Sequence, residues 1–403
     1  MSDSRADIAH VLRRTTFGPF PGQVDTFADR DAEAVLDDLL AAPSPETELP
    51  ELGTDDDDTL LALWWLERMA APEAGLHEKL TLFWHGHFTS SMDKVDTPKL
   101  MLDQHRLLRD HALGNFRDLV RAITIDGAML RWLDGADSTG DAPNENYARE
   151  LMEVFTLGHG TFSEADVRAG ARALAGWTID DRSRVTFDPA RAFNGTVTFL
   201  GRTGRLDADD VADAVCDQPA CAPFVAGRLH RFFVGTDPDD RRRAELAEVF
   251  TASGLEIRPL VDAILRDPSF MAARHTRPRY PVEWVVPVTP VLGATLDDTW
   301  PLELLGQRLF HPPNVAGWPA GPRWLSGGPT MVKAALCTWW WDDTEVVDHA
   351  DPVAAALERA SIYDASETTR AAMADAVRHV EGRREQASLL LALAVCAPEF
   401  QLA

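Results

Sequence analysis

Apolar side chains recur every three or four residues along most of the chain, which is the period of an amphipathic helix. The segments with this pattern are residues 5–14, 30–41, 59–71, 75–84, 97–113, 115–125, 127–133, 144–158, 163–176, 208–216, 220–233, 238–252, 257–266, 281–292, 326–341, 352–359, 367–382 and 385–396. Alternation with a period of two is confined to residues 184–200, where Asn194-Gly195 separates two short runs and predicts that they pair as a β-hairpin. We therefore predict an all-α fold, mainly helical, with one small β-hairpin near residues 184–200.

Several of these segments begin at residues that commonly cap helices. Asn115 and Asp126 precede two of them, and their side chains can accept hydrogen bonds from the free N–H groups of a first turn. Ser163 and Asp166 have the spacing of a capping box. We expect helices to begin at these residues.

The segment from Asn144 to Gly158 has both of its ends marked. Asn144 can cap the first turn, and Gly158 can end the helix in the left-handed conformation. On a wheel of about 100° per residue, Tyr147, Leu151 and Val154 form an apolar ridge. We expect this ridge to face the core.

A polar stripe beside this ridge is the first candidate site. Asn146, Glu150 and Glu153 line up one turn apart, and burying such groups is costly unless they have partners. The three residues are our candidates for catalysis, with Glu150 as a general base or ligand and Asn146 orienting substrate or water. A structural alternative stays open, because the carboxylates could be solvated or could pair with Arg149 or with the arginines of the next helix.

His85-Gly86-His87 is the second candidate, at the end of a predicted helix. Within a helix, residues two apart point in nearly opposite directions. If Gly86 ends the helix and the chain becomes extended, both imidazoles project to one side and could bind a transition metal. The alternative is that the two histidines cap the helix and pack beside Trp84 and Phe88.

Together with the polar stripe, the two histidines would form a mixed imidazole and carboxylate site. Such ligands suit iron, manganese or zinc better than magnesium, which prefers oxygen. The Glu-x-x-His signature of di-iron bundles is absent from the sequence. A metal-dependent enzyme is therefore one hypothesis, with an unidentified transition metal as its cofactor.

The third candidate is the segment from Phe310 to Pro319, which is rich in proline, glycine and tryptophan. These residues fix a rigid loop. His311, Asn314 and Trp318 could line a binding surface, or the loop could be a structural plug over the core.

Composition excludes some functions. The chain has 39 basic and 64 acidic residues, a net charge of −25, which repels phosphate backbones and argues against a nucleic-acid partner. The four cysteines include no CxxC pair, so we expect no zinc–cysteine site. Cys216 and Cys221 could meet, but we expect inert thiols.

No targeting or membrane signal is recognisable. The sequence has no run of 18 apolar residues, so we expect no transmembrane segment. Arg13-Arg14 is followed by a helix stop and not by an apolar stretch, so we reject a twin-arginine signal. These observations predict a cytoplasmic location.

The chain resembles the bacterial family known as domain of unknown function 1800. The matching segments are His10 to Gly18, Phe83 to Phe88, Asn144 to Gly158, Asp166 to Trp177, Phe310 to Trp318 with Trp324, and Ser388 to Phe400. The resemblance covers the whole chain and implies a single large helical domain over residues 1–403. The activity of the family is not established.

The resemblance also implies a partner. Members are often exported and encoded beside an exported sulfatase-like family, so the second hypothesis is a non-catalytic binding or assembly partner of such a protein, exported with it. This chain departs from the family pattern in lacking a recognisable signal. It also has Phe193-Asn194 where the family tends to carry a His-Asp pair, which would alter any family metal site that uses that histidine.

Overall fold

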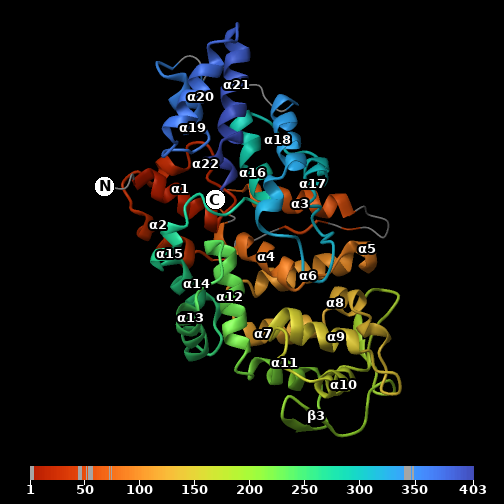
Figure 1. Ribbon diagram of the computed structural model, residues 1–403. Coiled ribbons are helices and arrows are strands. Elements are labelled where there is room, and N and C mark those ends of the chain that lie inside the picture. Colours follow the sequence, from red (N-terminus) through yellow and green to blue (C-terminus); the bar gives the residue numbers. More distant parts are fainter. Residues whose placement is uncertain are drawn as a thin grey trace.

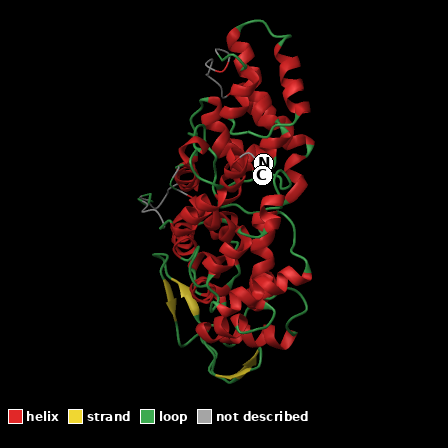
Figure 2. Ribbon diagram, turned by 90° about the vertical axis from the view of Figure 1, so that its left-hand side faces the viewer, coloured by secondary structure: helices red, strands yellow, loops and turns green. Residues whose placement is uncertain are grey.

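The computed structural model describes residues 4–43, 48–50, 52, 58–71, 73, 75–339, 346 and 349–403. Its helices form an elongated body, and the start of α1 and the C-terminus both lie near the middle of its length (Figures 1 and 2). The short strands lie at one end of this body (Figure 2). Across the described ranges, no helix combines the length and the low polarity that crossing a bilayer requires.

The helices account for most of the described chain, which confirms the mainly helical fold. Up to the strands, the elements are α1 (Ser4–Thr15), η1 (Val24–Phe27), α2 (Ala32–Ala41), α3 (Asp58–Ala70), α4 (Gly75–His87), α5 (Met92–Val95), α6 (Pro98–Asp110), α7 (Phe116–Thr124), α8 (Gly127–Trp132), η2 (Gly135–Asp137), α9 (Glu145–Glu150), η3 (Leu151–Thr156) and α10 (Glu164–Ala173). The strands are β1 (Trp177–Ile179), β2 (Val185–Phe187), β3 (Val197–Phe199) and β4 (Arg202–Gly204). The remaining helices are α11 (Ala208–Cys216), α12 (Cys221–Val234), α13 (Asp240–Ala252), α14 (Ile257–Leu265), α15 (Pro268–Ala272), α16 (Pro281–Leu292), α17 (Trp300–Leu305), η4 (Gly321–Leu325), α18 (Gly327–Trp339), α19 (Pro352–Arg359), α20 (Glu367–Val377), α21 (Arg383–Cys396) and α22 (Pro398–Gln401). The last two residues of the predicted helix 326–341 lie outside the described residues.

Buried apolar side chains form two cores. The first core gathers α1, α2, α7 and α9 to α15, and the second gathers α3 and α16 to α22. Helices α4, α6 and α8 contribute side chains to both cores. In Figure 1, α4 and α6 lie between α3 and α16 on one side and α7 and α9 on the other. A residue on α4 can therefore face either core, depending on its position around the helix.

The strands pair differently from the prediction. β2 pairs with β1, and β3 pairs with β4, so the two runs flanking Asn194-Gly195 do not pair with each other. The β3–β4 turn is formed by Leu200 and Gly201, whose φ angles of 46° and 86° are those of a type I′ turn. The ring of Phe187 packs on Trp177 at 5.3 Å, which holds β2 against β1. The predicted single hairpin is therefore replaced by two.

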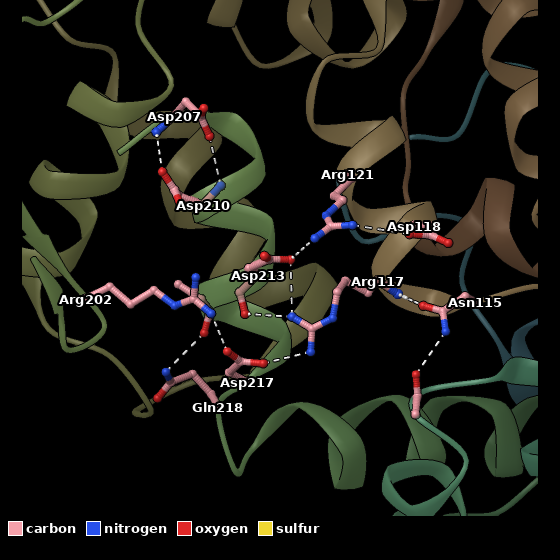
Figure 3. Close-up of polar contacts among 12 residues, drawn as sticks. Asn115, Arg117, Asp118, Arg121, Arg202, Asp207, Asp210, Asp213, Asp217 and Gln218 are labelled. Atoms are coloured by element: carbon pink, nitrogen blue, oxygen red, sulfur yellow. Dashed lines mark hydrogen bonds and ion pairs between the residues drawn. The ribbon is translucent and has the colours of Figure 1, made fainter. Parts of the chain in front are cut away.

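The predicted caps of Asn115, Asp126, Asn144 and Ser163 are confirmed, since each side chain accepts from a backbone N–H in its first turn. Figure 3 shows the cap of Asn115 at the start of α7.

The helix that begins after Asn144 changes its winding. It continues past α9 as a π-helix, η3, in which Leu157 N donates to Met152 O at 2.8 Å. Gly158 follows with φ of 82°, as predicted. The wider π turn rotates later side chains away from the α-helical wheel. Val154 is consequently only partly buried, and the adjacent Phe155 is fully buried.

A buried ion-pair network joins α4 to α16. Arg277 donates two hydrogen bonds of 2.9 Å to the carboxylate of Glu283, and Lys79 Nζ lies 2.5 Å from Glu283 Oε1. All three side chains are at most 6% exposed. The two cations hold the pKa of Glu283 far below its ordinary value despite its burial. Removing Glu283 would leave both buried cations without their counter-charge.

A more exposed network joins α7 to α11 (Figure 3). Arg117 Nη2 lies 2.7 Å from Asp217 Oδ1, and Arg121 Nη2 lies 2.7 Å from Asp213 Oδ1. Because these side chains are 24 to 46% exposed, each pair contributes little to stability. The network joins α11 to α7.

Candidate functional site

The segment His85-Gly86-His87 is helical throughout. The helix α4 includes both histidines, so the prediction that Gly86 ends it is wrong. The close approach at this point requires glycine at position 317, because a Cβ atom added to Gly317 would lie 2.3 Å from the carbonyl oxygen of Gly86, whereas a Cβ atom added to Gly86 would meet only Trp318, at 3.9 Å. The two histidines therefore point to opposite sides of α4.

His87 faces the first core. Its ring packs against Phe83, Trp84 and Phe88, and its Nε2–H donates to the carbonyl oxygen of Phe155, 2.8 Å away. This nitrogen carries the ring proton, because a carbonyl oxygen can only accept. Burial lowers the pKa of His87 to about 3, so its ring is neutral near pH 7.

His85 faces the second core. The centroid of its ring lies 5.3 Å from Trp65, 5.2 Å from Phe310 and 5.3 Å from Trp318. Burial lowers its pKa to about 3. Neither of its ring nitrogens has a hydrogen-bond partner in the described part of the chain. His85 and His87 thus occupy separate surroundings and do not form the predicted pair on one side.

The polar stripe lies on the outside of the molecule. Glu153 Oε1 lies 2.8 Å from Nδ1 of His159, whose side chain is 86% exposed. Asn146 is exposed, and Glu150 is half-buried. Burial, followed by the charge of Glu153, raises the pKa of Glu150. The structure therefore places the stripe toward solvent, while the ring of His87 lies in the core.

The arginine predicted as a partner of the stripe is engaged elsewhere. Arg149 donates through Nη1 and Nη2 to the two carboxylate oxygens of Glu164, each at 2.7 Å, and lies 3.6 Å from Glu145. The carboxylate of Glu150 accepts no hydrogen bond from the described residues. Arg149 therefore does not form the predicted ion pair with Glu150 or Glu153, and Glu150 is the least satisfied carboxylate of the stripe.

The loop from Phe310 to Trp318 is anchored at both ends. The carbonyl oxygen of Phe310 accepts from Met92 N at 2.9 Å, and the Phe310 ring is fully buried. At the other end, Gly317 lies against Gly86, and the half-buried ring of Trp318 packs on His85. Two segments that the sequence singled out separately, one on α4 and one in this loop, are therefore in contact.

His311 is fixed between two carboxylates. Its Nδ1 lies 2.6 Å from Asp93 Oδ1, and its Nε2 bonds to Asp58, which also accepts from Arg308 at 2.8 Å. Each ring nitrogen of His311 therefore has its own carboxylate partner. Because both ring nitrogens are occupied, His311 holds the loop in place and has no nitrogen free for a ligand.

Asn314 lies at the exposed tip of the loop. Its side-chain oxygen accepts from Ala316 N at 2.9 Å, and its backbone oxygen accepts from Gly317 N at 3.0 Å. These bonds form an Asx turn that fixes the tip. Pro313, Asn314 and Ala316 are exposed. The loop is thus anchored by its aromatic residues and presents small and polar groups to solvent.

Comparison with known proteins gives a family. A family model described as "Protein of unknown function (DUF1800)" matches residues 10–402. The chain belongs to this family. No curated protein and no solved structure matches it.

The DUF1800 chain has a further buried histidine close to His85, which sequence reasoning missed. His105 on α6 lies 4.6 Å from Trp65 and 5.8 Å from Phe310 between ring centroids, and it interacts electrostatically with His85. Both of its ring nitrogens lack partners among the residues described, and burial lowers its pKa well below the ordinary value. The sequence does carry a signal for His105. It lies one helical turn after Met101, so it is a polar residue on the apolar face of α6.

The described residues of this DUF1800 protein do not form an evident metal centre. No group of three or more His, Cys, Asp or Glu side chains within them is positioned to hold an ion. A cavity beside the His311 anchor has a volume of about 10 Å³, enough for about one water molecule. Its lining residues are Asp58, Thr59, Ala62, Thr299, Leu302, Arg308 and Leu309. Catalysis and metal binding by the predicted residues thus remain predictions.

Proposed function

We propose that this DUF1800 protein is a non-catalytic binding protein whose recognition element is the loop from Phe310 to Trp318. One observation carries the proposal: the loop is held at both ends and at His311, while its tip is exposed. A surface loop that is already ordered loses little conformational entropy when a partner binds.

The partner we propose is an exported sulfatase-like protein, as the family resemblance implies. The net charge of −25 favours a partner with a basic surface and speeds the encounter at low salt. The exposed tip offers Asn314 for hydrogen bonds and Pro313 for apolar contact. In this proposal the partner binds over α3, α4 and α5, against which the loop is anchored.

The test is complex formation between the purified chain and the sulfatase-like protein encoded in the same genome, measured by biolayer interferometry at moderate salt. We expect Pro313→Gly to weaken binding, because it loosens the tip, and Asn314→Ala to weaken it further. Glu150→Gln is the matched control and should bind as tightly as the wild type. The absence of a complex, or equal binding by all four proteins, would exclude the proposal.

A second candidate function is an enzyme that uses the polar stripe. Glu150 is half-buried with a raised pKa, and it precedes a π-helix, a feature frequent at functional sites. In this proposal Glu150 transfers a proton, the charges of Glu153 and His159 adjust the pKa of Glu150, and Asn146 orients the substrate. No step in it requires a metal.

The enzyme candidate is tested by assaying the chain against chromogenic esters of carboxylic, phosphoric and sulfuric acids. An activity that Glu150→Gln abolishes and Glu145→Gln retains would favour the enzyme over the binding protein. Elemental analysis of untagged protein tests in parallel for a bound transition metal. A chain with no activity and no bound metal would exclude both the metal-independent and the metal-dependent enzyme.

A further inference from the structure

Two cysteines far apart in the sequence lie side by side. Cys337 is on α18 and Cys396 is the last residue of α21, and these two helices pack against each other. The sulfur atoms are 3.9 Å apart. Cys337 is 1% exposed and Cys396 is partly exposed, so Cys396 is the more accessible residue of the pair.

The surroundings differentiate the two thiols. Lys333 lies one helical turn before Cys337, and its Nζ donates to Gln401 Oε1 at 2.6 Å. The hydrogen bond from Cys337, supported by the charge of Lys333, lowers the pKa of Cys396. Bonding to Cys396 and burial raise the pKa of Cys337. The more accessible sulfur is therefore also the better nucleophile.

We propose that Cys337 and Cys396 form a disulfide that links α18 to α21, by exchange with a low-molecular-weight disulfide such as glutathione disulfide. A disulfide needs a sulfur–sulfur distance of about 2.05 Å, so the two atoms must approach by about 1.9 Å. Rotation about the side-chain bonds and a small shift of the last turn of α21 can supply this, because α21 ends at Cys396.

The exchange proceeds in two steps. The Cys396 thiolate attacks one sulfur of glutathione disulfide, forming a mixed disulfide and expelling one glutathione thiolate. Cys337 then loses its proton to solvent and attacks the Cys396 sulfur, expelling the second glutathione thiolate. The two protein thiols are oxidised, one glutathione disulfide is reduced to two thiols, and the two protons released by the cysteines end on glutathione.

The chain contains an internal comparison for this reaction. Cys216 and Cys221 also lie within hydrogen-bonding range of each other, at the junction of α11 and α12. Both are buried, and Cys221 is fully so. We expect this pair to react more slowly under native conditions, because an oxidant cannot reach either sulfur without local opening.

The experiment treats the folded full chain with glutathione disulfide, blocks the remaining thiols and maps the peptides by mass spectrometry. We expect a peptide joined through Cys337 and Cys396, and a melting temperature about 5 °C higher than that of the reduced chain, from closing a loop of about 60 residues. A stable glutathione adduct on Cys396, or thiols that react only in denaturant, would overturn the proposal.

Two variants separate the crosslink from general effects of oxidation. Cys396→Ser should remove both the joined peptide and the rise in melting temperature, while Cys216→Ser should retain both. Cys337→Ser should stop the reaction at the mixed disulfide on Cys396, which identifies the attacking sulfur. An equal rise in melting temperature in Cys396→Ser would show that this linkage is not responsible.

Discussion

The carboxyl group of Asp126 should make the stability of this protein fall as pH rises. Asp126 caps α8, where its Oδ2 accepts from Met129 N at 2.8 Å and from Gln104 Nε2 at 2.7 Å. Ser90 Oγ donates to Gln104 Oε1 at 2.5 Å, so the network is closed. Burial raises the pKa of Asp126 to about 7, because these bonds do not fully replace the lost hydration.

The sign and size of the effect follow from the two pKa values of Asp126. In the unfolded chain the carboxyl has its ordinary value of 3.8, and in the folded chain about 7. Between these values the folded protein retains a proton that the unfolded chain has released, so stability is highest below 3.8 and falls up to about pH 7. The difference of about 3 pH units corresponds to about 4 kcal/mol.

Asp126→Asn removes the titration and keeps an acceptor for both hydrogen bonds. We expect the free energy of unfolding of the wild type, relative to Asp126→Asn, to fall by about 4 kcal/mol between about pH 4 and about pH 8. Urea unfolding followed by circular dichroism measures this difference. Asp239→Asn is the matched control, because Asp239 caps α13 in an exposed position. A difference between wild type and Asp126→Asn that does not change with pH would refute the reasoning.

Three further predictions concern stability. Glu283→Gln leaves two buried cations uncompensated and should lower the free energy of unfolding by about 3–5 kcal/mol in urea titrations. Gly317→Ala should lower it by at least about 2 kcal/mol, because its Cβ would meet the Gly86 carbonyl and its φ is 83°. His87 has a pKa lowered to about 3, so its contribution is present above pH 6.5 and is lost as pH falls. His87→Phe should therefore unfold at a lower pH than the wild type in an acid titration; an unchanged midpoint would contradict this.

The helices and their caps could be predicted because their signals are local. Asn144 bonds to Asn146 N, two residues away, and Gly158 adopts its left-handed conformation at the end of the same helix. The strand pairing failed although Asn194-Gly195 is a favourable turn, because Val185 and Val197 pair with other neighbours. Short strands are selected by the packing around them, which local sequence does not describe.

The candidate site could not be assembled from the sequence for a related reason. Gly86 has the residue type of a helix end, but α4 continues through it, and its carbonyl oxygen lies against Gly317 of a distant loop. The winding change after Glu150 has no local marker either, and Phe155 in the π-helix bonds to His87, 68 residues away. Residue types identified the segments that meet, and only tertiary contacts determine which of their faces meet.

Helix α4 packs into two cores through opposite faces, and this limits how the protein can come apart. Trp84 packs in the first core and Leu82 packs in the second. If one core unfolds and α4 loses its position, the other core loses the apolar side chains that α4 contributes to it. Heating should consequently produce one calorimetric peak for both cores. Fragments produced by cleaving the chain before or after α4 should aggregate, because each fragment would expose an apolar surface that the other fragment covers in the intact protein.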